Sequence, residues 1–132
     1  MLRNIYFKIN ELLGYFPAVV LLGARQSGKT TLAKALRPDW LYCDLEKASD
    51  FNRIEHDPEF FFQQYLQHII IDEAQRSPKL FETLRGVIDQ QRNIPGRFIL
   101  SGSSSPELLK NVTESLAGRV AIVELGTFKA NE

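Results

Sequence analysis

The sequence predicts an α/β domain in which helices surround a parallel β-sheet. Five short apolar segments alternate along the chain with segments that carry helix start and stop signals, as strands joined by helical crossovers do. The apolar segments are continuous, which indicates strands buried on both faces. The expected strands cover residues 18–22, 40–45, 68–73, 97–100 and 120–125. The length of 132 residues favours a single domain over residues 1–132.

The composition is that of an ordinary globular domain, with 44% hydrophobic and 24% charged residues. The 16 basic and 16 acidic residues cancel, so the net charge does not support nucleic acid as a partner. No apolar run approaches the roughly 18 residues of a membrane span. Arg3, Lys8 and Glu11 also interrupt any signal-peptide core. We therefore expect no membrane association.

Start and stop residues define the expected helices. The first 16 residues (1–16) are expected to form an N-terminal helix over residues 4–15, with apolar residues at helical spacing that pack on the sheet. Residues 47–66 are expected to hold one or two short helices. An N-cap residue followed by proline at the first helical position predicts three helix starts. These pairs are Asp57-Pro58, Ser77-Pro78 and Ser105-Pro106.

A glycine-rich segment joins the first expected strand to a helix over residues 28–36. It reads Gly23-Ala24-Arg25-Gln26-Ser27-Gly28-Lys29-Thr30, followed by Thr31. This is the pattern G-x-x-x-x-G-K-[ST] in the strand–loop–helix setting of a phosphate-binding loop. Backbone N–H groups of such a loop and of the helix N-terminus point at the phosphates. Lys29 is expected to reach the β- and γ-phosphates, and the Thr30 hydroxyl to ligate Mg²⁺.

Two adjacent carboxylates, Asp72 and Glu73, follow the apolar run 69–71. Open α/β sheets bind ligands at the carboxyl ends of their strands. In Mg²⁺-dependent phosphoryl transfer an acid at the end of a neighbouring strand completes the metal site, and a second group orients or deprotonates the attacking water. We therefore expect Asp72 to bind Mg²⁺ together with Thr30, and Glu73 to act as the base toward water.

Other polar residues stand at strand ends. Asp44 either faces the same site or caps the turn that follows its strand. The Ser-Gly run over residues 101–105 is expected to contact a γ-phosphate or its water, although such runs also form plain loops. Cys43 is the single cysteine and lies in an apolar run, so a buried structural role is expected. Together with the phosphate loop, it indicates the reducing cytoplasm.

Four stretches occur in an order that resembles a known family. They are Gly23 to Leu32, Ile69 to Arg76, Leu100 to Ser104 and Leu116 to Val120. Together they resemble the bacterial and archaeal AAA+ ATPases whose ATPase domain is commonly joined to a C-terminal domain of the DUF4143 type. The resemblance covers residues 15–126. Its most specific parts are the Arg-Gln pair inside the loop and the Asp-Glu-Ala-Gln stretch.

The resemblance implies a three-layer P-loop NTPase of the AAA+ type with ATP and Mg²⁺ as cofactors. It implies a five-stranded parallel sheet of order 5-1-4-3-2 with helices on both faces. Lys29 and Thr30 match the Walker A motif. Asp72 and Glu73 match Walker B, with Glu73 as the residue that activates water for ATP hydrolysis.

Two further roles follow only from the resemblance. Ser103 is similar to the sensor 1 residue that follows the fourth strand and is expected to contact the γ-phosphate. Arg119 stands just before the fifth strand, where AAA+ proteins often carry an arginine finger that acts on a neighbouring subunit. The resemblance therefore implies a homo-oligomer through Arg119. The alternative is that Arg119 is a solvated or ion-paired surface arginine.

Proteins of this kind continue past the fifth strand into a helical lid with a sensor 2 arginine, and then into the C-terminal domain. The chain ends at Glu132, so we expect it to lack both parts. The expected function is Mg²⁺-dependent ATP hydrolysis coupled to a conformational switch. The alternative is a nucleotide-binding regulatory module with little turnover, because a lid normally closes the site and excludes water. A small P-loop kinase is disfavoured, since a dedicated water-activating Glu73 suits an enzyme whose acceptor is water.

Overall fold

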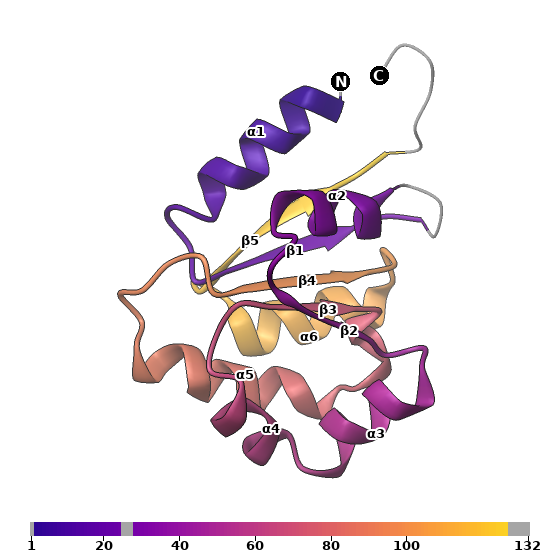
Figure 1. The fold of residues 1–132 in the computed structure, drawn as a ribbon, viewed down its shortest axis with the longest axis vertical. Coiled ribbons are helices and arrows are strands. Elements are labelled where there is room, and N and C mark those ends of the chain that lie inside the picture. Colours follow the sequence, from indigo (N-terminus) through magenta and orange to yellow (C-terminus); the bar gives the residue numbers. More distant parts are fainter. Residues whose placement is uncertain (1, 25–27, 127–132) are drawn as a thin grey trace.

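The computed structural model describes residues 2–24 and 28–126 and confirms the α/β class, with a five-stranded sheet at its centre (Figure 1). Every strand pairing is parallel, and the order across the sheet is β2-β3-β4-β1-β5. This is the implied order, counted from the opposite edge. The strands are β1 (Ala18–Leu22), β2 (Leu41–Asp44), β3 (Ile69–Asp72), β4 (Phe98–Gly102) and β5 (Val120–Glu124).

Helices cover both faces of the sheet and form two outer layers (Figure 1). One face carries α1 (Leu2–Leu12) and α2 (Lys29–Leu36). The opposite face carries α3 (Ala48–His56), α4 (Pro58–Gln64), α5 (Lys79–Gln90) and α6 (Pro106–Leu116). A short 3₁₀ turn, η1 (Ala74–Arg76), joins β3 to α5. No helix in the described part of the chain has the length and hydropathy needed to cross a bilayer.

The core lies on both sides of the sheet, because successive strand residues point to opposite faces. Val20 and Leu22 of β1 belong to the cluster under α3 to α6. Val19 and Leu21 belong to the cluster under α1 and α2. All residues of β1 are buried, which is why its sequence is continuously apolar and shows no period of two.

Parallel pairing brings the carboxyl ends of the strands to one edge of the sheet. In the register, Leu22 is opposite Gly102, and Asp44 is opposite Asp72. The segments that follow β1, β3 and β4 therefore meet at this edge, although they lie far apart in the sequence. The predicted phosphate loop and the predicted acidic pair belong to two of these segments.

Several expected boundaries are wrong. The N-terminal helix covers Leu2–Leu12 instead of residues 4–15, because residues 13–15 form a turn. Two further boundaries differ because of contacts with other elements. Strand β4 extends to Gly102, beyond the expected residue 100, because Ser101 and Gly102 still pair with β1. Helix α5 begins at Lys79, and Ser77 does not cap it. The Ser77 hydroxyl donates instead to Glu55 Oε1 at 2.5 Å, after the preceding 3₁₀ turn. By contrast, Asp57 and Ser105 cap α4 and α6 as expected.

Candidate functional site

The predicted phosphate loop begins directly after β1 and leads into α2. The N–H of Gly23 donates to the carbonyl of Gly102 at 3.1 Å, which ties the start of the loop to the end of β4. Gly28 is the N-cap of α2 and has φ 83°, a left-handed conformation that glycine adopts without a steric penalty. The loop residues Arg25, Gln26 and Ser27 lie outside the described residues. Thr31, also predicted to bind nucleotide, is an exposed residue of the first turn of α2.

Lys29 is a buried cation at the first position of a helix. Its side chain is only 2% exposed. Its Nζ donates to the carbonyl of Ala24 at 3.2 Å and lies 3.6 Å from Glu73 Oε2. The positive end of the helix dipole disfavours a cation at this position, and a buried ammonium needs a partner. The location therefore suits a lysine that binds an anion at the N-terminus of α2.

Asp72 is the most heavily hydrogen-bonded carboxylate at this edge. It is 6% exposed. Thr30 Oγ1 donates to Oδ2 at 2.8 Å, and the Tyr42 hydroxyl donates to the same oxygen at 2.7 Å. Ser101 Oγ donates to Oδ1 at 2.5 Å. Burial alone raises the pKa of Asp72, but these three hydrogen bonds and the charge of Lys29 outweigh it, so the pKa is lowered.

The side-chain oxygens of Asp72 and Thr30 suit a Mg²⁺ ion that is bound together with phosphate. Mg²⁺ prefers oxygen ligands and is usually held by one or two carboxylates plus substrate phosphates and water. Asp72 and the adjacent Thr30 hydroxyl would supply the protein ligands. Among the described residues no group of three or more His, Cys, Asp or Glu side chains is arranged to hold a metal ion.

Glu73 has an unusual backbone for a residue with a side chain, with φ 56° and ψ 48°. The left-handed region costs an L-residue roughly 1–2 kcal/mol, and such strain is often found at functional sites. The Glu73 side chain is 12% exposed and lies against Lys29. Its other oxygen, Oε1, accepts from Gln75 Nε2 at 2.7 Å. The fold thus brings the predicted base beside the predicted phosphate-binding lysine.

Three contacts of this site, made by Tyr42, Ser101 and Gln75, are not predicted by the sequence. Tyr42 lies on the neighbouring strand β2, and Ser101 lies inside β4, so only the sheet register places their hydroxyls on Asp72. Lys34 Nζ also lies 4.0 Å from the centre of the Tyr42 ring. The signal for Ser101 in the sequence is that a polar residue directly follows a buried apolar run.

Ser103 and Asp44 lie at the same edge with different surroundings. Ser103 follows the last residue of β4 and is partly exposed, and its carbonyl accepts from the N–H of Ser105 at 2.8 Å. Its predicted contact with a γ-phosphate stays a prediction. Asp44 Oδ1 accepts from the N–H of Glu46 at 2.9 Å, so this side chain caps the turn after β2. Cys43 is buried, and burial raises the pKa of its thiol to about 11, as suits a structural cysteine.

Arg119 lies at the opposite edge of the sheet. It directly precedes β5, whose first residue, Val120, is opposite the first residue of β1. A five-residue strand separates the two edges by roughly 16 Å. Arg119 Nε and Nη2 donate to the two carboxylate oxygens of Asp89 on α5, at 2.7 and 2.9 Å. This arginine is therefore distant from the phosphate loop of its own chain.

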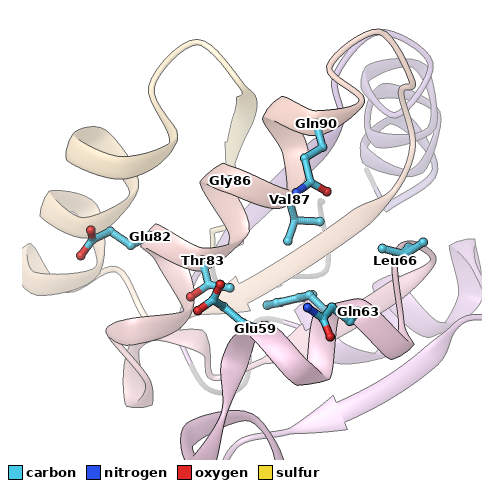
Figure 2. Close-up of a pocket in the computed structure, with 9 residues that line it drawn as sticks. Glu59, Gln63, Leu66, Glu82, Thr83, Gly86, Val87 and Gln90 are labelled. Carbon is cyan, nitrogen blue, oxygen red and sulfur yellow. The ribbon is translucent and has the colours of Figure 1, made fainter.

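A hollow between α4 and α5 is separate from the carboxyl edge of the sheet that carries the candidate site (Figure 2). Its volume is about 340 Å³, and it belongs to the helical layer on the face opposite α2. Two carboxylates and no cationic side chain are among the described residues that line it, so it does not suit a phosphate. The lining residues are Glu59, Phe62, Gln63, Leu66, Glu82, Thr83, Gly86, Val87 and Gln90.

The chain is similar to several known proteins. The family model described as AAA domain matches residues 15–132. Two curated relatives, the uncharacterized proteins Mb2031c of Mycobacterium bovis and Rv2008c of Mycobacterium tuberculosis, are each 41% identical over 125 residues. The match covers 93% of this chain and 28% of each relative, so the chain spans just over a quarter of their length.

Among solved structures, the chain is similar to the Walker-type ATPase PABY2304 of Pyrococcus abyssi. The TM-score is 0.69, and the match covers 97% of this chain and 54% of that one. Because the sequence identity is 19%, this likeness supports the fold alone. The family match, by contrast, extends over the loop, the acidic pair and all five strands. The chain therefore belongs to the AAA domain family, as a nucleotide-binding, AAA-like ATPase domain.

Proposed function

We propose that this chain binds Mg²⁺-ATP at the loop Gly23–Thr30 and hydrolyses it, and that the hydrolysis drives a conformational switch. One observation carries the proposal. The loop and the acidic pair are separated by more than forty residues in sequence, yet Thr30 and Asp72 form a 2.8 Å hydrogen bond. Lys29 and Glu73 form a 3.6 Å ion pair beside it. The four side chains needed for phosphate, metal and water therefore lie together.

The side chains divide the work by their chemistry. Bound Mg²⁺ would neutralise phosphate charge. Asp72 stays ionised because its pKa is lowered, so it remains a ligand at neutral pH. Lys29 exchanges its contact with Glu73 for the phosphates and thereby stabilises the negative charge. Glu73, once released from Lys29, has one oxygen available to orient a water and accept its proton. Ser103 is proposed to contact the γ-phosphate from the end of β4.

The test measures phosphate release and nucleotide binding in the same set of variants. With Mg²⁺-ATP, the wild type is expected to release phosphate, whereas Glu73→Gln binds ATP and loses on the order of 10²–10⁴-fold in turnover. ATP at about 100 times its Kd stabilises the fold by roughly 2.7 kcal/mol, which raises Tm by roughly 10 °C. Lys29→Ala is expected to lose this rise.

Two substitutions of exposed residues on α6 serve as matched controls. Lys110→Ala and Glu114→Gln repeat the same changes of charge on the far face of the sheet, and both should behave as wild type. If the wild type binds ATP but releases no more phosphate than Glu73→Gln, the hydrolysis proposal is wrong and the chain is a nucleotide-binding module. If Lys29→Ala binds ATP as tightly as wild type, the phosphate site itself is wrongly placed.

A further inference from the structure

We infer that Gln75 is a positioning residue, which holds the carboxylate of Glu73 for its role toward water. The inference rests on the proposed hydrolysis and assigns a further residue to the same site. Gln75 does not lie in the phosphate loop and is not expected to contact nucleotide or metal. Its side chain acts on the reaction only through Glu73. Two observations support its position against the Glu73 carboxylate.

The first observation is the hydrogen bond between the two side chains. Gln75 Nε2 donates to Glu73 Oε1 at 2.7 Å. The left-handed backbone of Glu73 and the following 3₁₀ turn bring the two side chains to the same place. Lys29 occupies the other oxygen, Oε2. When Lys29 moves to phosphate, the Gln75 contact remains. Gln75 would then leave Oε1 bonded and Oε2 directed to the water.

The second observation is a space made for the Gln75 amide by a glycine. A Cβ added to Gly102 would meet Gln75 Oε1 closer than real Cβ contacts allow, and would also lie 2.6 Å from Leu108 Cδ2. Gln75 Oε1 is buried and has no hydrogen-bond partner within the described part of the chain. An orphaned buried acceptor carries a cost. The side-chain amide of Gln75 is therefore packed against Gly102 at a cost in folding free energy, and its Nε2 donates to Glu73.

Gly102 connects this arrangement to the loop. Its carbonyl accepts from the N–H of Gly23, the first residue of the phosphate loop. The amide of Gln75 thus lies between the end of β4, where the loop starts, and the carboxylate that must face the water. A neutral donor suits this task, because it orients a carboxylate without supplying a competing positive charge beside Lys29.

The experiment compares kcat with nucleotide affinity in Gln75→Met, Gln75→Ala and Glu73→Gln. Methionine keeps the length and volume of glutamine and lacks the amide. Residues that orient the ligands of a metal site typically contribute 10–100-fold, and we take the same range for a residue that orients a base. We therefore expect kcat to fall by about 10–100-fold in both Gln75 variants, with the Kd for Mg²⁺-ATP unchanged. Gln63→Met, an exposed glutamine on α4, should keep wild-type values.

A double-substitution test uses the glycine. Gly102→Ala should displace the amide and lower kcat as Gln75→Ala does. In a Gln75→Ala background it should lower kcat no further, because coupled sites are not additive. If the two losses multiply, Gly102→Ala acts through its clash with Leu108 and not through the Gln75 amide, and the second observation no longer supports the inference.

An NMR measurement reads the contact without turnover. The side-chain amide resonances of Gln75 should shift when Glu73 is changed to Ala, and a spectrum without that shift overturns the inference. Wild-type kcat in Gln75→Met, together with lost turnover in Glu73→Gln, also overturns the inference and leaves the proposed function standing. If Glu73→Gln releases phosphate like wild type, the proposed function fails, and the role of Gln75 in turnover fails with it.

Discussion

At the residue scale, the Asp72 carboxylate combines burial with three hydroxyl donors from three different elements. Thr30 comes from α2, Tyr42 from β2 and Ser101 from β4. A carboxylate held in this way keeps its charge at neutral pH although it is buried. The Tyr42 hydroxyl stays a donor, because burial and the neighbouring Asp72 raise the pKa of the phenol. The Asp72 carboxylate is thus charged and held by hydrogen bonds from three elements.

Ser101→Ala tests this hydrogen-bonded carboxylate. The pKa of Asp72 is lowered in the folded state, so its stabilising contribution is present above the unfolded pKa of about 3.9 and is lost as pH falls through the folded pKa. Removing the Ser101 donor raises the folded pKa of Asp72 and should cost about 1–3 kcal/mol at pH 7. Urea unfolding at pH 7 and pH 3 measures the difference.

Comparing the two pH values shows whether Ser101→Ala acts by removing a hydrogen bond to the charged Asp72 carboxylate or only by changing packing. The loss in Ser101→Ala should shrink at the lower pH, because the hydrogen bond to the Asp72 carboxylate stabilises the fold less as pH falls toward the lowered folded pKa. Ser104→Ala, on the exposed neighbouring segment, is the matched control and should change stability little at either pH. An equal loss at both pH values for Ser101→Ala would contradict the assigned role of the Asp72 charge.

At the element scale, the helix caps show how far a local pattern determines a helix start. Ser105 and Ser77 are both followed by proline. Ser105 Oγ accepts from the N–H of Leu108 at 3.1 Å and begins α6. Ser77 instead donates to Glu55 from α3, and α5 begins after Pro78. The difference comes from a tertiary neighbour, since the local sequences are alike.

Ser105→Ala should lower the free energy of unfolding by about 1 kcal/mol, because the first turn of α6 loses its cap. Ser105→Asp should restore most of the loss, since Asp is an equally good N-cap residue. Chemical denaturation of both variants measures the effect. Equal stability of Ser105→Ala and wild type would show that the cap contributes nothing to the stability of α6.

At the scale of the whole molecule, the two edges of the sheet carry different groups. The carboxyl edge carries Lys29, Asp72 and Glu73. The opposite edge carries Arg119, whose pKa is raised by its hydrogen bond to Asp89. We propose that Arg119 acts on the nucleotide of a second copy of the chain, because the full length of β5 separates it from the loop of its own copy.

Mixing two inactive variants tests this arrangement. Arg119→Ala should lose turnover on the order of 10³-fold, as the loss of an arginine finger does in other phosphoryl-transfer systems. Its phosphate site is intact, and the Arg119 of Lys29→Ala is intact. A mixture of the two should therefore recover phosphate release through mixed assemblies. Asp89→Asn keeps the arginine and removes its anionic partner, so it should retain turnover.

Recovered phosphate release in the mixture would show that Arg119 acts on a neighbouring copy and is not needed only for its ion pair with Asp89. If Arg119→Ala and Asp89→Asn lose turnover equally, Arg119 acts by holding β5 to α5. If the mixture stays inactive at concentrations where the chain is oligomeric, the proposed contact between copies is wrong.

Local sequence patterns were enough to predict the fold class, the five strands, and the positions of the loop and the acidic pair. These features are local: a buried strand is continuously apolar, a helix start needs a cap, and a phosphate loop needs glycine, lysine and threonine in a row. Such patterns are complete within a few residues, so the strands and most helix starts could be predicted from them. The roles of Lys29, Thr30, Asp72 and Glu73 stay predictions.

Only the tertiary structure decided which side chains surround Asp72 and Glu73. Tyr42 and Ser101 reach Asp72 because β2 and β4 flank β3 in a particular register, and no local pattern encodes a cross-strand neighbour. Gln75 reaches Glu73 because the backbone of Glu73 is left-handed and Gly102 has no side chain. Contacts between residues far apart in the sequence depend on the packing of the whole sheet, and that packing is what arranges these residues into a site.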